Sequence, residues 1–245
     1  MTHSIAPDDE LIARARLAGA GVVKHTPVTG SAAISEACGG EAVLKAENLQ
    51  RTGSFKIRGA MAKVASLGAD AVRGVTAGSA GNHAQALAFA ARHHGVPCQI
   101  FVPAGAPISK TEACRAYGAE VIEGGASLSE AVTFAKARAA ETGMTFCHPY
   151  DDPITVAGQA TLGLELLEDL PSLRRVVVPL GGGGLAAGVA IAVKRSRPDV
   201  KVIGVQADVC APYANQAVPE GAVLTLADGI AVKLPGAVTR PLIEE

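Results

Sequence analysis

Short apolar runs alternate with longer helical patterns along this sequence from residue 8 onward. Runs such as 97–103 and 174–180 are short and apolar and are bounded by proline or glycine, which predicts buried strands. Segments such as 82–95, rich in alanine and ended by a glycine, predict helices. Strands that alternate with helices of this length form parallel sheets covered by helices on both faces. The sequence therefore predicts an α/β fold.

The same alternation indicates how the chain divides into domains. Residues 74–147 have the pattern of a compact small domain, inserted into a large domain formed by 1–73 and 148–245. The last segment, "LADGIAVKLPGAVTRPLIEE", begins a helical pattern after Thr239 and then stops. Because an α/β sheet seldom ends on the first turn of a helix, we expect part of the fold to lie beyond residue 245.

The composition argues against several classes of protein. Of the 245 residues, 49% are hydrophobic and 18% are charged, which is typical of a globular chain with a sizeable core. The net charge is −1, no basic block is longer than Lys194–Arg195, and aromatic residues are few, so no nucleic-acid partner is expected. The N-terminal residues have the pattern of neither a signal peptide nor a membrane span.

The cysteines bear on compartment and metal binding. Their number is odd and no pair has C-x-x-C spacing; they stand at positions 38, 98, 114, 147 and 210. This pattern favours reduced thiols in the cytoplasm and argues against a zinc site. We therefore expect a cytoplasmic protein with no metal site and no membrane association.

Four consecutive glycines interrupt the segment "VVVPLGGGGLAAG" between a predicted strand and a predicted helix. Free backbone N–H groups at the positive end of a helix dipole bind a phosphate without any lysine. A tight turn alone would need only one or two glycines. The same letters also match a dinucleotide fingerprint, Gly181-x-Gly183-x-x-Ala186, but Gln206 stands where that fingerprint expects an acidic residue. The pattern favours a phosphate site, with nucleotide binding as the weaker alternative.

A second helix start follows the small residues of "TAGSAGNHAQALA", where Asn82 and His83 open the helical pattern. Backbone N–H groups at such a terminus suit a carboxylate. Asn82 is alternatively only a helix cap, and His83 is alternatively a surface residue in the first turn.

Lys56 stands in "ENLQRTGSFKIRGA", at the start of a predicted helix over 54–68 that Ser54 or Thr52 would cap. A lysine near the positive end of a helix is disfavoured and has a lowered pKa, which leaves a neutral amine for Schiff-base chemistry. An amine of this kind, a phosphate site and a carboxylate site together suit a phosphorylated aldehyde that condenses with an amino acid. Pyridoxal 5'-phosphate fits that description.

From about His25 to the C-terminus the chain resembles the threonine/serine dehydratases, also called threonine ammonia-lyases. The resemblance rests on "ENLQRTGSFKIRGA", "TAGSAGNHAQALA", "DDPITVAGQATLGLELLEDL", "VVVPLGGGGLAAG" and "LADGIAVKLPG", which occur in family order and spacing. Those enzymes are pyridoxal phosphate enzymes of fold-type II, the tryptophan synthase β-like class. The resemblance implies two open parallel-sheet domains, here truncated at the C-terminus.

The resemblance also implies roles for individual residues. Lys56 would form the Schiff base with the cofactor, next to Phe55, and Asn82 would bond the 3' oxygen of the ring. The phosphate would be held by main-chain N–H groups of Gly181, Gly182, Gly183, Gly184 and Leu185. The substrate carboxylate would be held by Ser54, Ser79, Ala80, Gly81, Asn82 and His83.

Some positions depart from related families. Ala80 stands where serine racemases of this superfamily have a second serine, which disfavours racemisation. Gln206 and Pro212 stand where metal-binding members have acidic residues, and the segment that would contact the pyridine nitrogen has no match.

The implied reaction is β-elimination of L-threonine or L-serine, a small hydroxyamino acid, to a 2-oxo acid and ammonia, by a homo-oligomer (dimer or tetramer). The alternatives are another enzyme of this fold, either a racemase or a β-replacement synthase, and an inactive or weakly cofactor-binding fragment.

Overall fold

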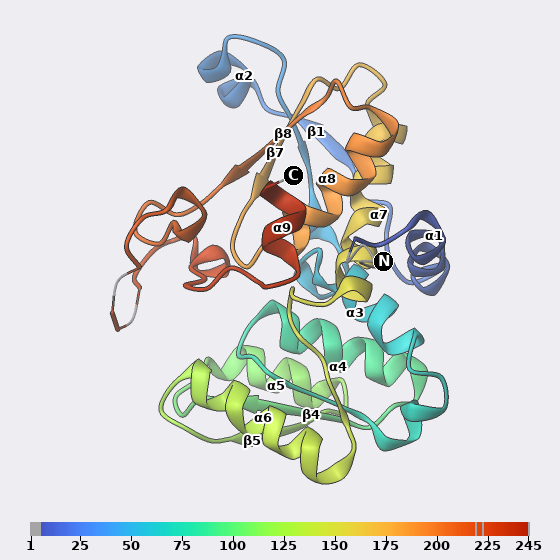
Figure 1. The fold of residues 1–245 in the computed structure, drawn as a ribbon, viewed down its shortest axis with the longest axis vertical. Coiled ribbons are helices and arrows are strands. Elements are labelled where there is room, and N and C mark those ends of the chain that lie inside the picture. Colours follow the sequence, from blue (N-terminus) through green and yellow to red (C-terminus); the bar gives the residue numbers. More distant parts are fainter. Residues whose placement is uncertain (1–5, 219, 222, 245) are drawn as a thin grey trace.

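The computed structural model describes residues 6–218, 220–221 and 223–244, and it has two lobes in Figure 1. The helices are α1 (Asp9–Ala18), α2 (Ala32–Cys38), α3 (Lys56–Ala65), α4 (Asn82–His94), α5 (Ile108–Ala116), α6 (Leu128–Thr142), α7 (Pro153–Asp169), α8 (Gly184–Ser196) and α9 (Thr239–Glu244). The strands are β1 (Val28–Gly30), β2 (Val43–Lys45), β3 (Val75–Gly78), β4 (Cys98–Val102), β5 (Glu120–Glu123), β6 (Thr145–Phe146), β7 (Arg175–Pro179) and β8 (Lys201–Val205). Short 3₁₀ turns include η1 (Glu47–Leu49), η2 (Arg51–Gly53), η3 (Gly68–Arg73), η4 (Pro212–Ala214) and η5 (Asp228–Ile230).

The lower lobe in Figure 1 is built on a four-stranded sheet of order β5-β4-β3-β6, and all its strand pairs are parallel. Alternate residues of β4 serve opposite faces. Ile100 belongs to a buried cluster with Leu87 of α4, whereas Phe101 packs with Ala131 of α6. Gly78 at the end of β3 lets α6 approach closely, since a Cβ there would lie 2.5 Å from the α6 backbone. Helices therefore cover both faces, as the sequence predicts.

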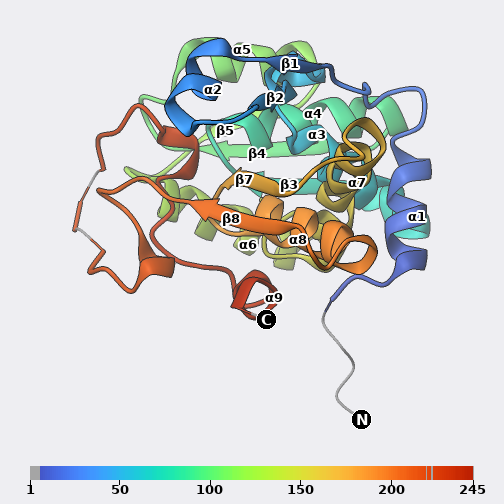
Figure 2. The same ribbon diagram turned by 90° about the horizontal axis from the view of Figure 1, so that it is seen from above.

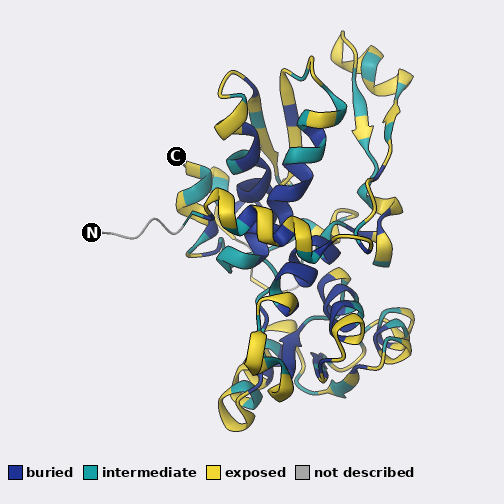
Figure 3. Ribbon diagram, turned by 90° about the vertical axis from the view of Figure 1, so that its right-hand side faces the viewer, coloured by how far each residue is buried: buried dark blue, intermediate teal, exposed yellow. Residues whose placement is uncertain are grey.

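The upper lobe contains the parallel strands β7 and β8, which are connected through α8. Helix α7 packs against α8. Helix α7 starts cleanly because Asp152 caps it and Pro153 occupies its first turn. Its contact with α8 is close, since a Cβ on Gly188 would lie 2.7 Å from the backbone nitrogen of Ala160. Figure 2 shows α9 beside α8, and Figure 3 shows buried residues concentrated along the central helices.

The α/β class with parallel sheets is confirmed. Strand β1 and its antiparallel pairing with β2, on the two sides of α2 in the sequence, were not predicted. No helix among the residues that the structure describes has the length and apolar character needed to cross a bilayer. The division into domains at residues 73/74 and 147/148 stays a prediction.

Candidate active site

Lys56 is the first residue of α3, and the backbone before it explains its position. Thr52 and Gly53 both have positive φ, 62° and 74°, so the chain makes a sharp turn before it reaches the helix. Ser54 is extended and Phe55 is the residue that precedes the first helical turn. The predicted cap by Ser54 or Thr52 is therefore wrong, because neither side chain is placed to bond the first turn.

Lys56 as a whole residue is half-buried, and its Nζ donates a hydrogen bond to the carbonyl oxygen of Pro149 over 2.7 Å. Burial lowers the pKa of Lys56 to about 8, because a charged ammonium loses hydration there. The predicted direction of this shift is confirmed, but its cause is burial rather than the helix end. The Phe55 ring lies 5.2 Å from Nζ, so it forms an apolar neighbour of the amine.

The second predicted group lies between β3 and α4. The backbone N–H of Ser79 donates to Phe101, and the N–H of Gly81 donates to the Ser79 hydroxyl over 3.3 Å. Gly81 precedes the first helical turn, so the alternative that Asn82 only caps the helix is wrong. Asn82 is exposed, and Ala80 is half-buried. Three small residues, Ser79–Gly81, thus lead from β3 to Asn82, the first residue of α4.

His83 is a buried residue rather than a surface one. Its Nε2 donates to the carbonyl oxygen of Cys147 over 2.9 Å, which leaves Nδ1 without a proton when the ring is neutral. Burial, followed by the nearby charge of Lys56, lowers the pKa of His83 to about 3. His83 is therefore neutral at physiological pH, and the alternative that places it on the surface is wrong.

The four glycines form the buried turn from β7 into α8. Gly183 has a φ of 100°, which other residues rarely adopt. A Cβ on Gly182 would lie 2.4 Å from the Tyr150 ring, and one on Gly183 would lie 2.4 Å from the Tyr213 hydroxyl. The N–H groups of the first turn of α8, including that of Leu185, have no acceptor within the helix. The loop therefore needs glycine for close packing, and it presents backbone donors at a helix start.

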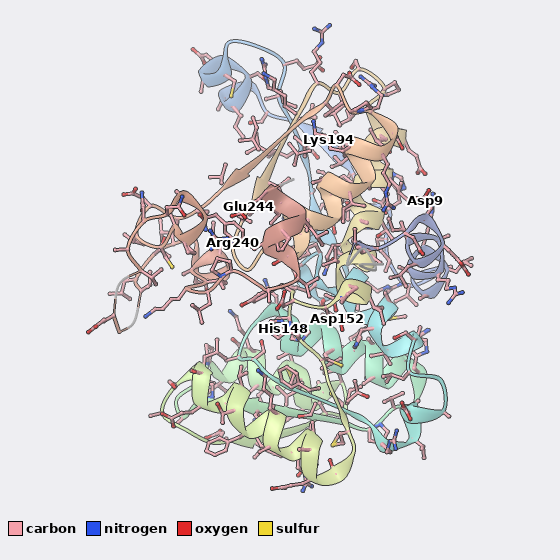
Figure 4. All side chains as sticks on the ribbon, in the orientation of Figure 1. Asp9, His148, Asp152, Lys194, Arg240 and Glu244 are labelled. Atoms are coloured by element: carbon pink, nitrogen blue, oxygen red, sulfur yellow. The ribbon has the colours of Figure 1, made fainter. Side chains whose placement is uncertain are left out.

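Residues 147–152, which we call the connecting segment, bring these groups together. The segment runs from β6 to α7, and Figure 4 shows His148 and Asp152 where the two lobes meet. The Pro149 carbonyl accepts the bond from Lys56, while the ring of the next residue, Tyr150, packs against the glycine loop. Phe55 packs on the buried cluster that includes Leu185, which follows that loop in the first turn of α8. The predicted amine and the predicted phosphate loop are thus held against neighbouring residues of one segment.

Sequence reasoning missed the connecting segment, whose local signal is limited to two prolines and an acidic pair in "CHPYDDP". Asp151 in this segment accepts three backbone N–H bonds, from Ala237 at 2.9 Å, Val238 at 2.7 Å and Thr239 at 3.2 Å. Its carboxylate therefore fixes the turn that begins α9. An acidic residue directly before a helix is easy to recognise as its cap, but Asp151 accepts hydrogen bonds from residues far along the chain.

Arg58 was also missed as a residue of interest. It lies two positions after Lys56, so its side chain leaves α3 on a different side. Its guanidinium is 1% exposed and makes two hydrogen bonds to Glu47, both of 2.8 Å, and two to Glu165, of 2.7 and 3.0 Å. These bonds tie the first turn of α3 to η1 and to α7.

The residues present fit a ligand with an aldehyde and an anionic group. The Ser54 hydroxyl is buried without a hydrogen-bond partner among the described residues, two positions before Lys56. Buried polar groups in native proteins are nearly always paired, so an unpaired one beside a reactive amine indicates a ligand. The lowered pKa of Lys56 suits condensation with an aldehyde, and the glycine loop suits a phosphate.

The chain is similar in sequence and in structure to known enzymes. An L-threonine ammonia-lyase of Thermotoga maritima is 48% identical over 230 residues, which cover 91% of this chain and 57% of that protein. The chain thus spans little more than half the length of this relative. Among solved structures, a threonine deaminase from T.th. has a TM-score of 0.89 at 37% identity, with 98% of this chain and 80% of that chain covered. The maize serine racemase structure has a TM-score of 0.91 at 34% identity, with coverages of 98% and 74%.

The family comparison is the most general of these findings. Residues 20–245 match the family model described as pyridoxal-phosphate dependent enzyme. The match includes the helix start with Lys56, the start of α4 and the glycine loop. Threonine ammonia-lyases are among the relatives of the chain in sequence, and the chain belongs to the family of pyridoxal-phosphate-dependent enzymes.

Proposed function

We propose that this chain provides the active site of a pyridoxal-phosphate-dependent ammonia-lyase, which converts L-threonine, L-serine or both to a 2-oxo acid and ammonia. The observation that carries the proposal is the Lys56 amine, which has a pKa lowered to about 8 and is held at Pro149, next to the residue that covers the glycine loop. The sequence relatives named threonine ammonia-lyases support the same activity.

In this proposal the cofactor, when bound, supplies an aldehyde that condenses with amines and a ring that delocalises the charge of a carbanion. Lys56 is the base, and its Nζ takes the proton from the substrate Cα. A pKa of about 8 leaves part of this amine uncharged near neutral pH, as a base requires. The water lost in elimination is regained on hydrolysis, so the net products are a 2-oxo acid and ammonia.

The remaining site residues bind and orient. Backbone N–H groups of Gly181–Leu185 hold the phosphate, and the Asn82 amide bonds the 3' oxygen of the ring. Ser54, together with residues 79–83, holds the substrate carboxylate. The support for these roles is the unpaired Ser54 hydroxyl and the two helix starts, since N–H groups in a first helical turn favour anions.

A racemase is the alternative that the structural similarity to maize serine racemase raises. Ala80 favours the lyase, because an alanine methyl group has no proton to deliver to the second face of the substrate carbon. Formation of D-serine from L-serine, measured by chiral chromatography next to 2-oxo acid release, separates the two reactions.

We also propose the organisation around this site. The small domain consists of residues 74–147 and the large domain of 1–73 and 148–245, which is supported by the four-stranded sheet within 75–146. The protein would act in the cytoplasm as a homo-oligomer, a dimer or tetramer. Its mass in solution, measured by light scattering, tests the oligomeric state.

The central experiment measures 2-oxo acid and cofactor attachment together. The purified chain is given L- and D-threonine and L- and D-serine, with and without added pyridoxal phosphate, and is then reduced with borohydride. We expect 2-oxo acid from the L-isomers and the mass of the reduced cofactor on the peptide that contains Lys56. The Lys56→Ala variant should lose both, whereas Lys201→Ala, an exposed lysine of β8, should lose neither.

Full turnover by Lys56→Ala would overturn the proposal. Cofactor attachment at Lys56 without 2-oxo acid from any of the four substrates would instead identify a cofactor-binding unit that does not complete the reaction.

A further inference from the structure

The carbonyl oxygen of Gly182, in the middle of the glycine loop, is surrounded by hydrogen-bond donors from distant parts of the chain. The Thr239 hydroxyl donates to it over 2.6 Å, the Tyr213 hydroxyl over 3.3 Å, and the backbone N–H of Gly236 over 3.4 Å. Thr239 is fully buried at the start of α9, and Tyr213 belongs to η4. Three donors on one carbonyl exceed what a turn needs in order to satisfy that group.

The Thr239 hydroxyl is itself held in place. Asp151 accepts the backbone N–H of Thr239 and those of the two residues before it. Gly236 allows this approach, because a Cβ there would lie 2.2 Å from the Asp151 carboxylate. The connecting segment thus positions the donor that reaches the glycine loop.

A planar trans peptide directs its C=O and its N–H to opposite sides. The bonds to the Gly182 carbonyl therefore direct the N–H of Gly183 away from Thr239 and Tyr213. Glycines have little conformational preference of their own, so a loop of four glycines needs outside contacts to keep one peptide orientation. Thr239 and Tyr213 supply these contacts.

We propose that Thr239 and Tyr213 are positioning residues of the phosphate-binding loop, which hold the Gly182 carbonyl so that the Gly183 N–H is presented to the phosphate. The inference rests on the proposed function, since it assigns the phosphate of the cofactor to this loop. Neither side chain touches the phosphate in this arrangement. Their effect is on the direction of one backbone donor.

The test compares pyridoxal phosphate with pyridoxal, which has the aldehyde but no phosphate. Dissociation constants are measured by absorbance titration for the wild-type chain and for Thr239→Val, Thr239→Ser and Tyr213→Phe, and inorganic phosphate is used as a competitor. The exposed Thr133→Val variant on α6 is the matched control. If the Gly183 N–H turns away in Thr239→Val, the phosphate loses one hydrogen bond, and loss of a bond to a charged group costs a factor of about 10 to 100 in affinity. Thr239→Val should therefore bind pyridoxal phosphate more weakly by about that factor.

Affinity for pyridoxal should be unchanged in Thr239→Val, and competition by inorganic phosphate should weaken in parallel with the affinity for pyridoxal phosphate. Thr239→Ser keeps the hydroxyl and should resemble the wild type, and Tyr213→Phe should show a smaller loss in the same direction. An equal loss for both ligands, or no loss for either, would overturn the inference. If Thr239→Val does not fold, the inference is overturned when Tyr213→Phe has the same ratio of affinities for pyridoxal phosphate and pyridoxal as the wild type. If the wild-type chain binds neither ligand, the proposed function itself fails.

Discussion

Replacement of Arg58 by methionine should destabilise the fold strongly, because it removes the cation from a buried cluster of charges. The guanidinium is 1% exposed and makes paired bonds to Glu47 and Glu165, whose side chains are each 12% exposed. Lys45 still lies 2.8 Å from Glu165 after the change, so one carboxylate keeps a partner. The Glu47 carboxylate keeps the bond from the Thr26 hydroxyl at 2.6 Å, which carries no charge.

Removal of one partner from a buried ion pair costs about 3–5 kcal/mol, since the other charge stays buried without compensation. Domains are typically stable by about 5–15 kcal/mol, so Arg58→Met should lose a large part of the free energy of unfolding. Methionine fills a similar apolar volume, which limits the cavity contribution to the loss. Because α3 begins with Lys56, the same change should also loosen the position of the amine.

The assay is urea unfolding of both chains, followed by circular dichroism. The matched control is Arg14→Ala, which breaks the exposed pair between Arg14 and Glu10 on α1 and should cost about 0–1 kcal/mol. A loss below about 1 kcal/mol for Arg58→Met would refute the reasoning, because the bonds would then add nothing beyond an exposed pair.

The pH dependence gives a second readout of the same cluster. Burial acts to raise the pKa of Glu165, but hydrogen bonds from Arg58 and Lys45 hold it below its ordinary value. A carboxylate whose pKa is lowered in the folded state stabilises the protein when the pH is above its unfolded-state pKa of about 4.3. This contribution is lost as the pH falls through the folded-state pKa. Arg58→Met should therefore show a weaker dependence of stability on pH in this acidic range than the wild type.

The site and its packing lead to three more expected outcomes. Labelling of Lys56 by an amine reagent, followed by mass spectrometry, should be half-maximal near pH 8, because burial lowers the pKa of Lys56 to about 8. A midpoint near pH 10.4, about that of an exposed lysine, would contradict the lowered pKa. Gly182→Ala should weaken binding of pyridoxal phosphate in an absorbance titration, since the new Cβ would lie 2.4 Å from the Tyr150 ring. An unchanged affinity would contradict this expectation and show that the ring is free to move away. Gly59→Ala should cost about 1–3 kcal/mol in thermal unfolding, because its Cβ would lie 2.5 Å from the Gln159 side chain of α7 and 2.9 Å from the Thr155 carbonyl oxygen. Gly40→Ala, whose Cβ would meet no atom within 4 Å, should cost far less.

Local patterns were sufficient to predict several of the elements and to suggest candidate site positions. The proline-bounded run at 97–103 contains β4, and the alanine-rich run at 82–95 contains α4. Both signals arise from neighbours in sequence, namely apolar periodicity and terminating residues. The glycine loop is recognisable for the same reason, since four consecutive glycines are visible without knowledge of the fold. The direction of the Lys56 pKa shift was also predicted, but from the helix end rather than from the burial that causes it.

The missed features depend on contacts between distant residues. Arg58 meets Glu165, 107 positions later, and Asp151 meets Thr239, 88 positions later. Both pairs join segments that are distant in sequence but packed together in the fold, and neither arginine nor aspartate carries a local signal for its partner. Strand β1 and its antiparallel pairing with β2 were missed because β1 has only three residues, too few to show a period.

The connecting segment has a consequence for hybrid proteins assembled from this chain and a relative. Its consecutive residues 149, 150 and 151 reach the lysine amine, the glycine loop and the turn before α9, respectively. An added or deleted residue among them would change the spacing between these attachments by about 3.3–3.6 Å, roughly one step of the main chain, so not all three could form together. A crossover point within this segment should therefore fail, whereas exchange of residues 147–152 as one block, together with the segments that they contact, preserves the spacing.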